Sequence, residues 1–76
     1  MINIENIREA IKNAELQMDA YSISTDASFR DVGMDSLDIF NVFLEIEKSF
    51  GIQIPDDKID KLQTIEAIQN YLNSIK

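Results

Sequence analysis

The residue best placed to do chemistry in this chain is Ser36, which follows a glycine-containing turn and precedes an apolar run. The residues around it read Asp31-Val32-Gly33-Met34-Asp35-Ser36-Leu37-Asp38. A serine in this place exposes its hydroxyl at a helix N-terminus, where a group can be attached. Nucleophilic catalysis would need a base to take the hydroxyl proton, and the chain contains no His. We therefore interpret Ser36 as the acceptor of a covalent modification.

The segment from Gly33 to Leu37, Gly-x-Asp-Ser-Leu, resembles the phosphopantetheine attachment site of acyl carrier proteins. The likeness continues through the helix that ends at Phe50 and through Ile54-Pro55-Asp56-Asp57, and it spans most of the 76 residues. The resemblance implies that a phosphopantetheinyl transferase uses coenzyme A to attach 4'-phosphopantetheine to Ser36 through a phosphodiester. It also implies a carrier without catalytic residues, whose arm holds acyl groups as thioesters between enzymes of fatty acid biosynthesis.

Length and composition predict one folded domain over residues 1–76, with 45% hydrophobic and 28% charged residues. A domain of this size buries only about 60% of the surface of its unfolded chain. No room remains for a walled active site, so an enzyme is the least favoured class. We expect a monomer.

Charge and cysteine content limit the classes of partner and of binding site that the chain can have. With 14 acids against 7 bases, the formal charge is −7, which argues against binding to nucleic acid or anionic membranes. Proteins with basic patches are the natural partners. No Cys or His is present, so we expect neither a disulfide nor a metal site, and a functional thiol must come from outside the sequence. Because no signal peptide or membrane span is recognisable, we expect a cytoplasmic protein.

The apolar spacing predicts an all-α, four-helix bundle with three longer helices and one short helix, which is also the fold that the resemblance implies. The first helix is expected over residues 3–16, with an apolar face and an opposite face that is solvated. The apolar face comprises Ile4, Ile7, Ile11 and Ala14, flanked by Ile2 and Ala10; the solvated face comprises Glu5, Arg8, Glu9, Lys12 and Glu15. A long loop follows from Met18 to Asp35, and we expect Phe29 and Val32 to fix it to the core.

Capping residues set the other boundaries. The second helix is expected to begin at Asp35 or Ser36, with Asp35 as N-cap, and to run to Phe50 before Gly51 ends it. A short third helix is expected over residues 56–60, after Pro55 and with two residues turned inward, Ile59 and Leu62. A final helix is expected after the cap Thr64. Its buried stripe is expected to comprise Ile65, Ile68, Leu72 and Ile75, with Tyr71 beside it.

The second helix carries two separate apolar arcs at 100° per residue. The first is a core face, made of Ile39, Val42, Phe43, Ile46 and Phe50. Leu37, Phe40 and Leu44 form the second arc, and Ser36 lies between the two. The second arc is either buried more deeply in the bundle or is an exposed ridge on which partners dock. We favour the ridge, and the polar residues expected to take part in docking are Asp35, Asp38, Asn41, Glu45 and Glu47.

Asp35 and Asp38 would repel a phosphodiester, although a helix N-terminus favours an anion. Capping explains Asp35. These carboxylates are also expected to meet Arg and Lys on the transferase and on the acyl transferases and synthases, which speeds and orients encounter.

The bundle interior could shelter the cargo. The residues expected to line such an acyl pocket are Phe43, Ile46, Ile54, Ile59, Ile68 and Tyr71. Ordinary core packing is the second reading of the same residues, and it is the one that we favour.

Several positions depart from the pattern of carriers of fatty acid synthesis: Phe40, Asn41, Lys48, Ser49 and Gln53. They leave the attachment motif intact and change the docking face. A carrier for a specialised pathway, such as a polyketide, lipid-modifying or aminoacyl system, is therefore an open alternative. An unmodified acidic module that binds proteins is a remoter one. The acids at 56, 57 and 60 do not form an EF-hand, which needs alternating acids, a central Gly and a terminal Glu.

Overall fold

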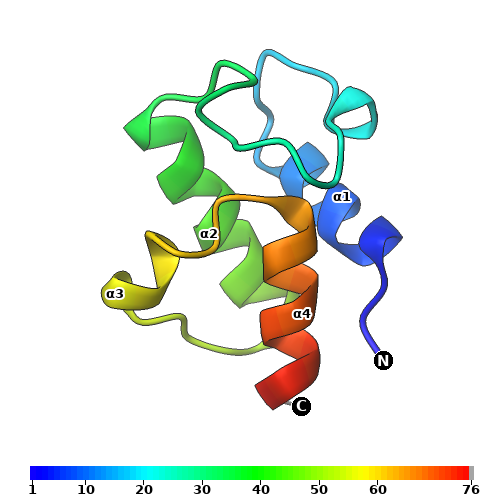
Figure 1. Cartoon of the computed structure of the whole chain (residues 1–76), viewed down its shortest axis with the longest axis vertical. Coiled ribbons are helices and arrows are strands. Elements are labelled where there is room, and N and C mark those ends of the chain that lie inside the picture. The colour runs from blue at the N-terminus through cyan, green and yellow to red at the C-terminus, as the bar shows by residue number, and fades with distance from the viewer. Residues whose placement is uncertain (76) are drawn as a thin grey trace.

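Helices make up the regular structure of residues 1–75, which are the residues that the computed structural model describes. They are α1 (Ile4–Asn13), the 3-10 helix η1 (Ala20–Ser22), α2 (Ser36–Phe50), α3 (Asp56–Ile59) and α4 (Ile65–Ile75). No strand occurs within residues 1–75. Figure 1 shows the long α1–α2 connection running over one end of the bundle, with α3 set to one side. The predicted all-α bundle of three longer helices and one short one is confirmed.

The core lies where the apolar faces of the three longer helices meet, and α1 packs against both α2 and α4. The most deeply buried side chains are Ile7, Ile11, Phe29, Val42, Phe43, Ile46, Ile65, Ile68 and Leu72. In the described part of the chain no polar or charged residue is buried. Burial of apolar surface is thus the main stabilising contribution, as the predicted helix faces require.

Helix α1 is shorter than the predicted range 3–16. It begins after Asn3, whose side chain forms a capping box with Asn6: each residue's backbone N–H donates to the other's Oδ1 at 3.0 Å. It ends at Asn13, because Glu15 adopts a left-handed φ of 56° that stops the helix. The apolar spacing alone could not reveal this turn.

Arg8 was predicted on the solvated face of α1, and the structure corrects this. Its Nη1 donates to the backbone oxygen of Ala20 at 2.9 Å and to that of Ile23 at 2.7 Å. The side chain thus ties the η1 segment to α1. The predicted loop from Met18 to Asp35 also contains this one turn of 3-10 helix, started by Asp19, whose carboxylate accepts from the Tyr21 N–H at 2.9 Å.

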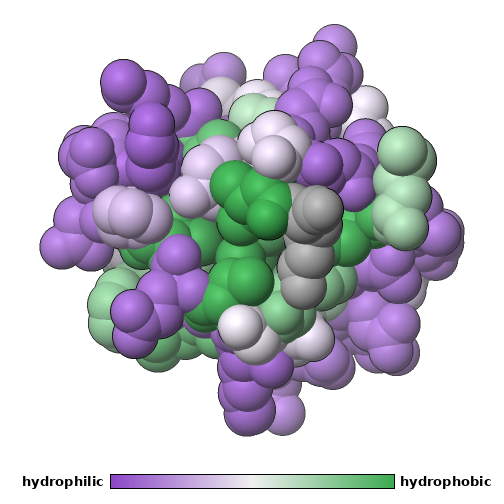
Figure 2. Space-filling model, turned by 90° about the horizontal axis from the view of Figure 1, so that it is seen from below, coloured by the Kyte–Doolittle hydropathy of each residue, from purple (hydrophilic) through white to green (hydrophobic). Residues whose placement is uncertain are grey.

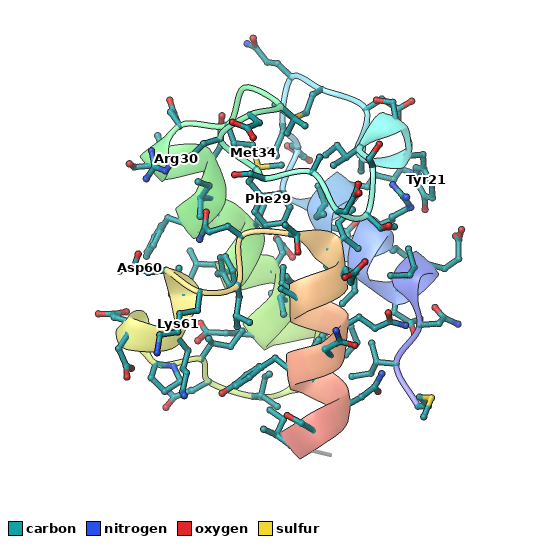
Figure 3. The ribbon with its side chains drawn as sticks, in the orientation of Figure 1. Tyr21, Phe29, Arg30, Met34, Asp60 and Lys61 are labelled. Carbon is teal, nitrogen blue, oxygen red and sulfur yellow. The ribbon has the colours of Figure 1, made fainter. Side chains whose placement is uncertain are left out.

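The remainder of the long connection is fixed by apolar side chains. Phe29 is fully buried and Val32 is half-buried against the core, as predicted. Met34 is also buried, although the sequence analysis did not single it out. Figure 3 shows Phe29 and Met34 directed into the interior. The backbone N–H of Phe29 donates to the Gln63 oxygen at 2.8 Å, which joins this loop to the α3–α4 connection.

The end of α2 and the start of α4 are as predicted. Gly51 ends α2 with a left-handed φ of 64°, and its N–H donates to the Glu47 oxygen. Thr64 caps α4, because its Oγ1 accepts from the Ala67 N–H at 3.0 Å. The short α3 ends at Ile59, one residue before the predicted end.

The buried stripe of α4 stops before Ile75, which was predicted to be buried and is 48% exposed. The reason is its place in the last turn, beyond the residues that α1 and α2 cover. Figure 2 views the molecule from the end where the two termini lie, and shows hydrophobic atoms at the centre with hydrophilic ones around them. The chain start is held there by Asn73, which exchanges two hydrogen bonds with the backbone of Ile2, at 2.9 and 3.0 Å.

Candidate functional site

Ser36 is the first residue of α2 and its side chain is exposed. The predicted N-cap Asp35 is confirmed: its Oδ1 accepts from the Asp38 N–H at 2.8 Å, and the Asp35 N–H donates in return to Asp38 Oδ2 at 3.3 Å. This capping box satisfies backbone donors that the first turn of a helix leaves free. It therefore fixes the backbone on both sides of the serine.

A tight turn delivers the chain to Ser36. The Gly33 N–H donates to the Arg30 oxygen at 3.1 Å, and the Met34 N–H donates to the Phe29 oxygen at 3.0 Å. Gly33 has a φ of 102°, a conformation that side chains with a Cβ rarely adopt. The glycine of the motif thus has a conformational reason, and the turn brings residues six positions apart together.

Arg30 is the residue that this turn places beside the serine. Its Nη2 lies 3.4 Å from Ser36 Oγ, a long hydrogen bond between two exposed side chains. The sequence analysis did not identify Arg30 as a site residue. A signal was available, because Arg30 is the only basic residue between Lys12 and Lys48.

A pocket of about 310 Å³ opens beside Ser36, between the start of α2 and the α3–α4 region. Its lining residues are Arg30, Ser36, Ile39, Phe40, Ile59, Asp60 and Gln63. Figure 3 shows Arg30 and Asp60 at the same edge of the molecule, opposite Tyr21. The pocket therefore has an apolar wall, one cationic side chain and one carboxylate.

Of the six residues predicted to line an acyl pocket, Ile59 is the only one that lines this cavity. Tyr71 is half-buried against the core. The other four belong to the buried core: Phe43, Ile46, Ile54 and Ile68. Their placement in this structure is that of packing residues, which was the second reading of the sequence.

The second apolar arc of α2 is exposed, which excludes the alternative of deeper burial. The exposed fractions are 65% for Leu37, 56% for Phe40 and 45% for Leu44. These three residues are called the α2 ridge below. They lie apart from the buried face of the helix, which comprises Ile39, Val42, Phe43 and Ile46.

The polar residues predicted to take part in docking have different surroundings. Asp35 is exposed, and Asp38, Asn41 and Glu45 are half-buried along α2. Lys48 Nζ lies 3.8 Å from Glu45 Oε1. Glu47 also has a structural role that the sequence did not reveal: its Oε2 accepts from the Ile54 N–H at 2.7 Å and holds the connector after α2.

No group of three or more His, Cys, Asp or Glu side chains within residues 1–75 could hold a metal ion. None of the helices found in that range is long and apolar enough to cross a bilayer.

The comparison with known protein families supplies the decisive observation. Residues 5–72 match the family model described as phosphopantetheine attachment site. The chain belongs to this family. Its members are carrier proteins that bear covalent 4'-phosphopantetheine and interact with phosphopantetheinyl transferases and partner enzymes.

The carrier's own residues fit this group. A phosphodiester link needs an accessible hydroxyl, and Ser36 exposes one at a capped helix start. The anion needs a positive neighbour because Asp35 and Asp38 lie close by, and the Arg30 guanidinium lies within 3.4 Å of Oγ. The adjacent pocket offers an apolar wall.

The cap and charge of Asp35 can be separated by substitution. We expect Asp35→Ala to lower the free energy of unfolding by about 1 kcal/mol, because the Asp38 N–H loses its acceptor. Asp35→Asn keeps an acceptor and is expected to stay within about 0.5 kcal/mol of the parent. Urea unfolding followed by circular dichroism measures both.

Asp31→Ala is the matched control, because Asp31 is an exposed acid of the same loop. Equal losses for Asp35→Ala and Asp35→Asn would show that charge, and not capping, explains the contribution of Asp35.

Proposed function

We propose that this chain is an acyl carrier domain in which Ser36 bears 4'-phosphopantetheine. The observation that carries the proposal is the exposed Ser36 hydroxyl at the capped start of α2, within a chain of the phosphopantetheine attachment site family. The terminal thiol of the arm holds acyl groups as thioesters. Since the sequence contains no Cys, this thiol has no competitor within the chain.

Loading is carried out by the partner enzyme. Ser36 Oγ forms a bond to the phosphorus of the pantetheine phosphate in coenzyme A, and the pyrophosphate P–O bond breaks to release adenosine 3',5'-bisphosphate. The hydroxyl proton passes to a base on the transferase, because the chain has no His and the side chain that hydrogen-bonds to Oγ is the cationic Arg30. The carrier thus takes part as a substrate and not as an enzyme.

The attachment site can be tested with a phosphopantetheinyl transferase and coenzyme A. We expect intact mass spectrometry to show the addition of one phosphopantetheinyl group to the parent protein. Ser36→Ala is expected to remain folded and to gain no mass. Ser49→Ala, which removes an exposed serine from the other end of α2, is the matched control and should load fully. Equal loading of Ser36→Ala would contradict the assignment.

We also propose that the α2 ridge, with Asp35, Asp38, Asn41, Glu45 and Glu47 around it, is where partners dock. Two features support this proposal. Three exposed apolar side chains lie on one helix face next to Ser36, and their acidic neighbours attract Arg and Lys. The partners are the transferase and the acyl transferases and synthases that carry basic patches. Their contacts are small and transient, under about 1,200 Å², which suits a monomeric shuttle.

The ridge can be tested through loading kinetics. We expect Leu37→Ala to lower the kcat/KM of the transferase by about five-fold or more, chiefly through KM, since an apolar contact worth about 1 kcal/mol is lost. Ile75→Ala, which truncates another exposed apolar residue, near the C-terminus, should leave kcat/KM unchanged. Identical kinetics for both variants would contradict the proposal that the transferase contacts the α2 ridge.

For the pathway, we propose fatty acid biosynthesis, with a specialised polyketide, lipid-modifying or aminoacyl pathway as the alternative. The specialised pathway is supported by Phe40, which enlarges the exposed ridge, and by Lys48, which pairs with Glu45 and reduces the acidity of α2. Loaded carrier is given malonyl groups and a competent set of fatty acid elongation enzymes. Elongation, detected by mass spectrometry, is expected for the first pathway. Its failure, with a known carrier elongated in parallel, favours the second.

A further inference from the structure

Gln63, one of the residues that line the pocket beside Ser36, has an amide group that the protein satisfies only in part. Gln63 Nε2 donates to the Ile59 backbone oxygen at 2.6 Å. The other amide atom, Oε1, is buried and is the one buried side-chain polar atom without a hydrogen-bond partner in the described residues 1–75. An unpaired buried acceptor is costly, and a donor from a ligand in the pocket would remove this cost once the Gln63 side chain turns toward it.

Arg30 also lines this pocket. Its guanidinium is the only cationic group in the lining, and Nη2 lies 3.4 Å from Ser36 Oγ. A phosphodiester formed on that oxygen therefore places its negative charge beside Arg30. A guanidinium can donate to two phosphate oxygens at once, which makes Arg well suited to this contact.

The size and lining of the pocket suit the phosphate end of the arm. Its volume of about 310 Å³ is at the lower end of small-molecule sites, which run from roughly 300 to 1,000 Å³. Phosphopantetheine offers a phosphate, two methyl groups on one carbon, a hydroxyl and two amide N–H groups. The lining offers complementary groups: Arg30 is a cation, and Asp60 and Gln63 are acceptors. Its apolar wall comprises Ile39, Phe40 and Ile59.

We propose that this pocket is a seat for the arm itself. Arg30 pairs with the phosphodiester, the methyl groups pack on Ile59, and the Gln63 side chain turns so that Oε1 accepts a hydrogen bond from an amide N–H of the arm. The inference rests on the proposed attachment at Ser36. Because Phe40 belongs to both the seat and the α2 ridge, a partner that contacts the ridge also touches a wall of the seat.

The test compares modified and unmodified protein by NMR and by thermal unfolding, after mass spectrometry has shown loading. In the loaded parent we expect nuclear Overhauser effects between the arm methyl groups and the Ile59 side chain. Loading is expected to raise Tm by about 4 °C or more, because the arm satisfies groups of the folded state only. Arg30→Gln and Gln63→Leu should each lose at least half of this rise, measured as loaded minus unloaded Tm of the same variant.

Lys12→Gln is the matched control, since it removes one positive charge from an exposed site on α1 and should keep the full rise. The seat is overturned if the loaded parent shows no arm–Ile59 effects, or if Arg30→Gln and Gln63→Leu keep the rise of the control. Either result leaves attachment at Ser36 intact. Failure of the parent to gain the mass of the group would instead refute the attachment on which the inference rests.

Discussion

The burial of Phe29 is the contact on which the site depends. Its ring is fully buried in the core, its N–H donates to the Gln63 oxygen, and its own oxygen accepts from Met34. The buried ring thus anchors the connection before α2. The backbone of the same residue stabilises the turn at Gly33 and joins it to the α3–α4 connection. Arg30, the next residue, reaches Ser36 only because this anchor holds the turn in place.

Electrostatic demands conflict at the start of α2, and the arrangement reconciles them. Asp35 and Asp38 stabilise the helix through the capping box, yet both would oppose an anion on Ser36. The helix N-terminus favours an anion by only about 0.3–1 kcal/mol. Arg30 supplies a full positive charge beside Oγ in a chain whose net charge is −7. The acids can therefore cap the helix while the hydroxyl keeps a local cation.

The small size of the chain explains why α2 presents an exposed apolar ridge. The helix has two apolar arcs, and only the one that contains Val42 and Ile46 is buried, on the helix that α1 packs against. The short α3 leaves the ridge open and contributes Ile59 to the pocket wall instead. The surface proposed for docking is thus exposed because so small a chain has few elements to cover it.

The features that could be predicted from the sequence alone depend on near neighbours. They are the helical spacing, the cap at Asp35, the stop at Gly51 and the cap at Thr64. These rest on hydrogen bonds and periodicities that span a few residues. Contacts between residues distant in sequence, and the exposure of each side chain, became visible only in the tertiary structure. Its contributions include the bonds of Arg8 to the η1 segment, the hold of Glu47 on Ile54, the approach of Arg30 to Ser36, the unpaired Gln63 Oε1 and the exposure of Ile75. No local pattern encodes such contacts, because each forms only after the loops have closed and the helices have packed.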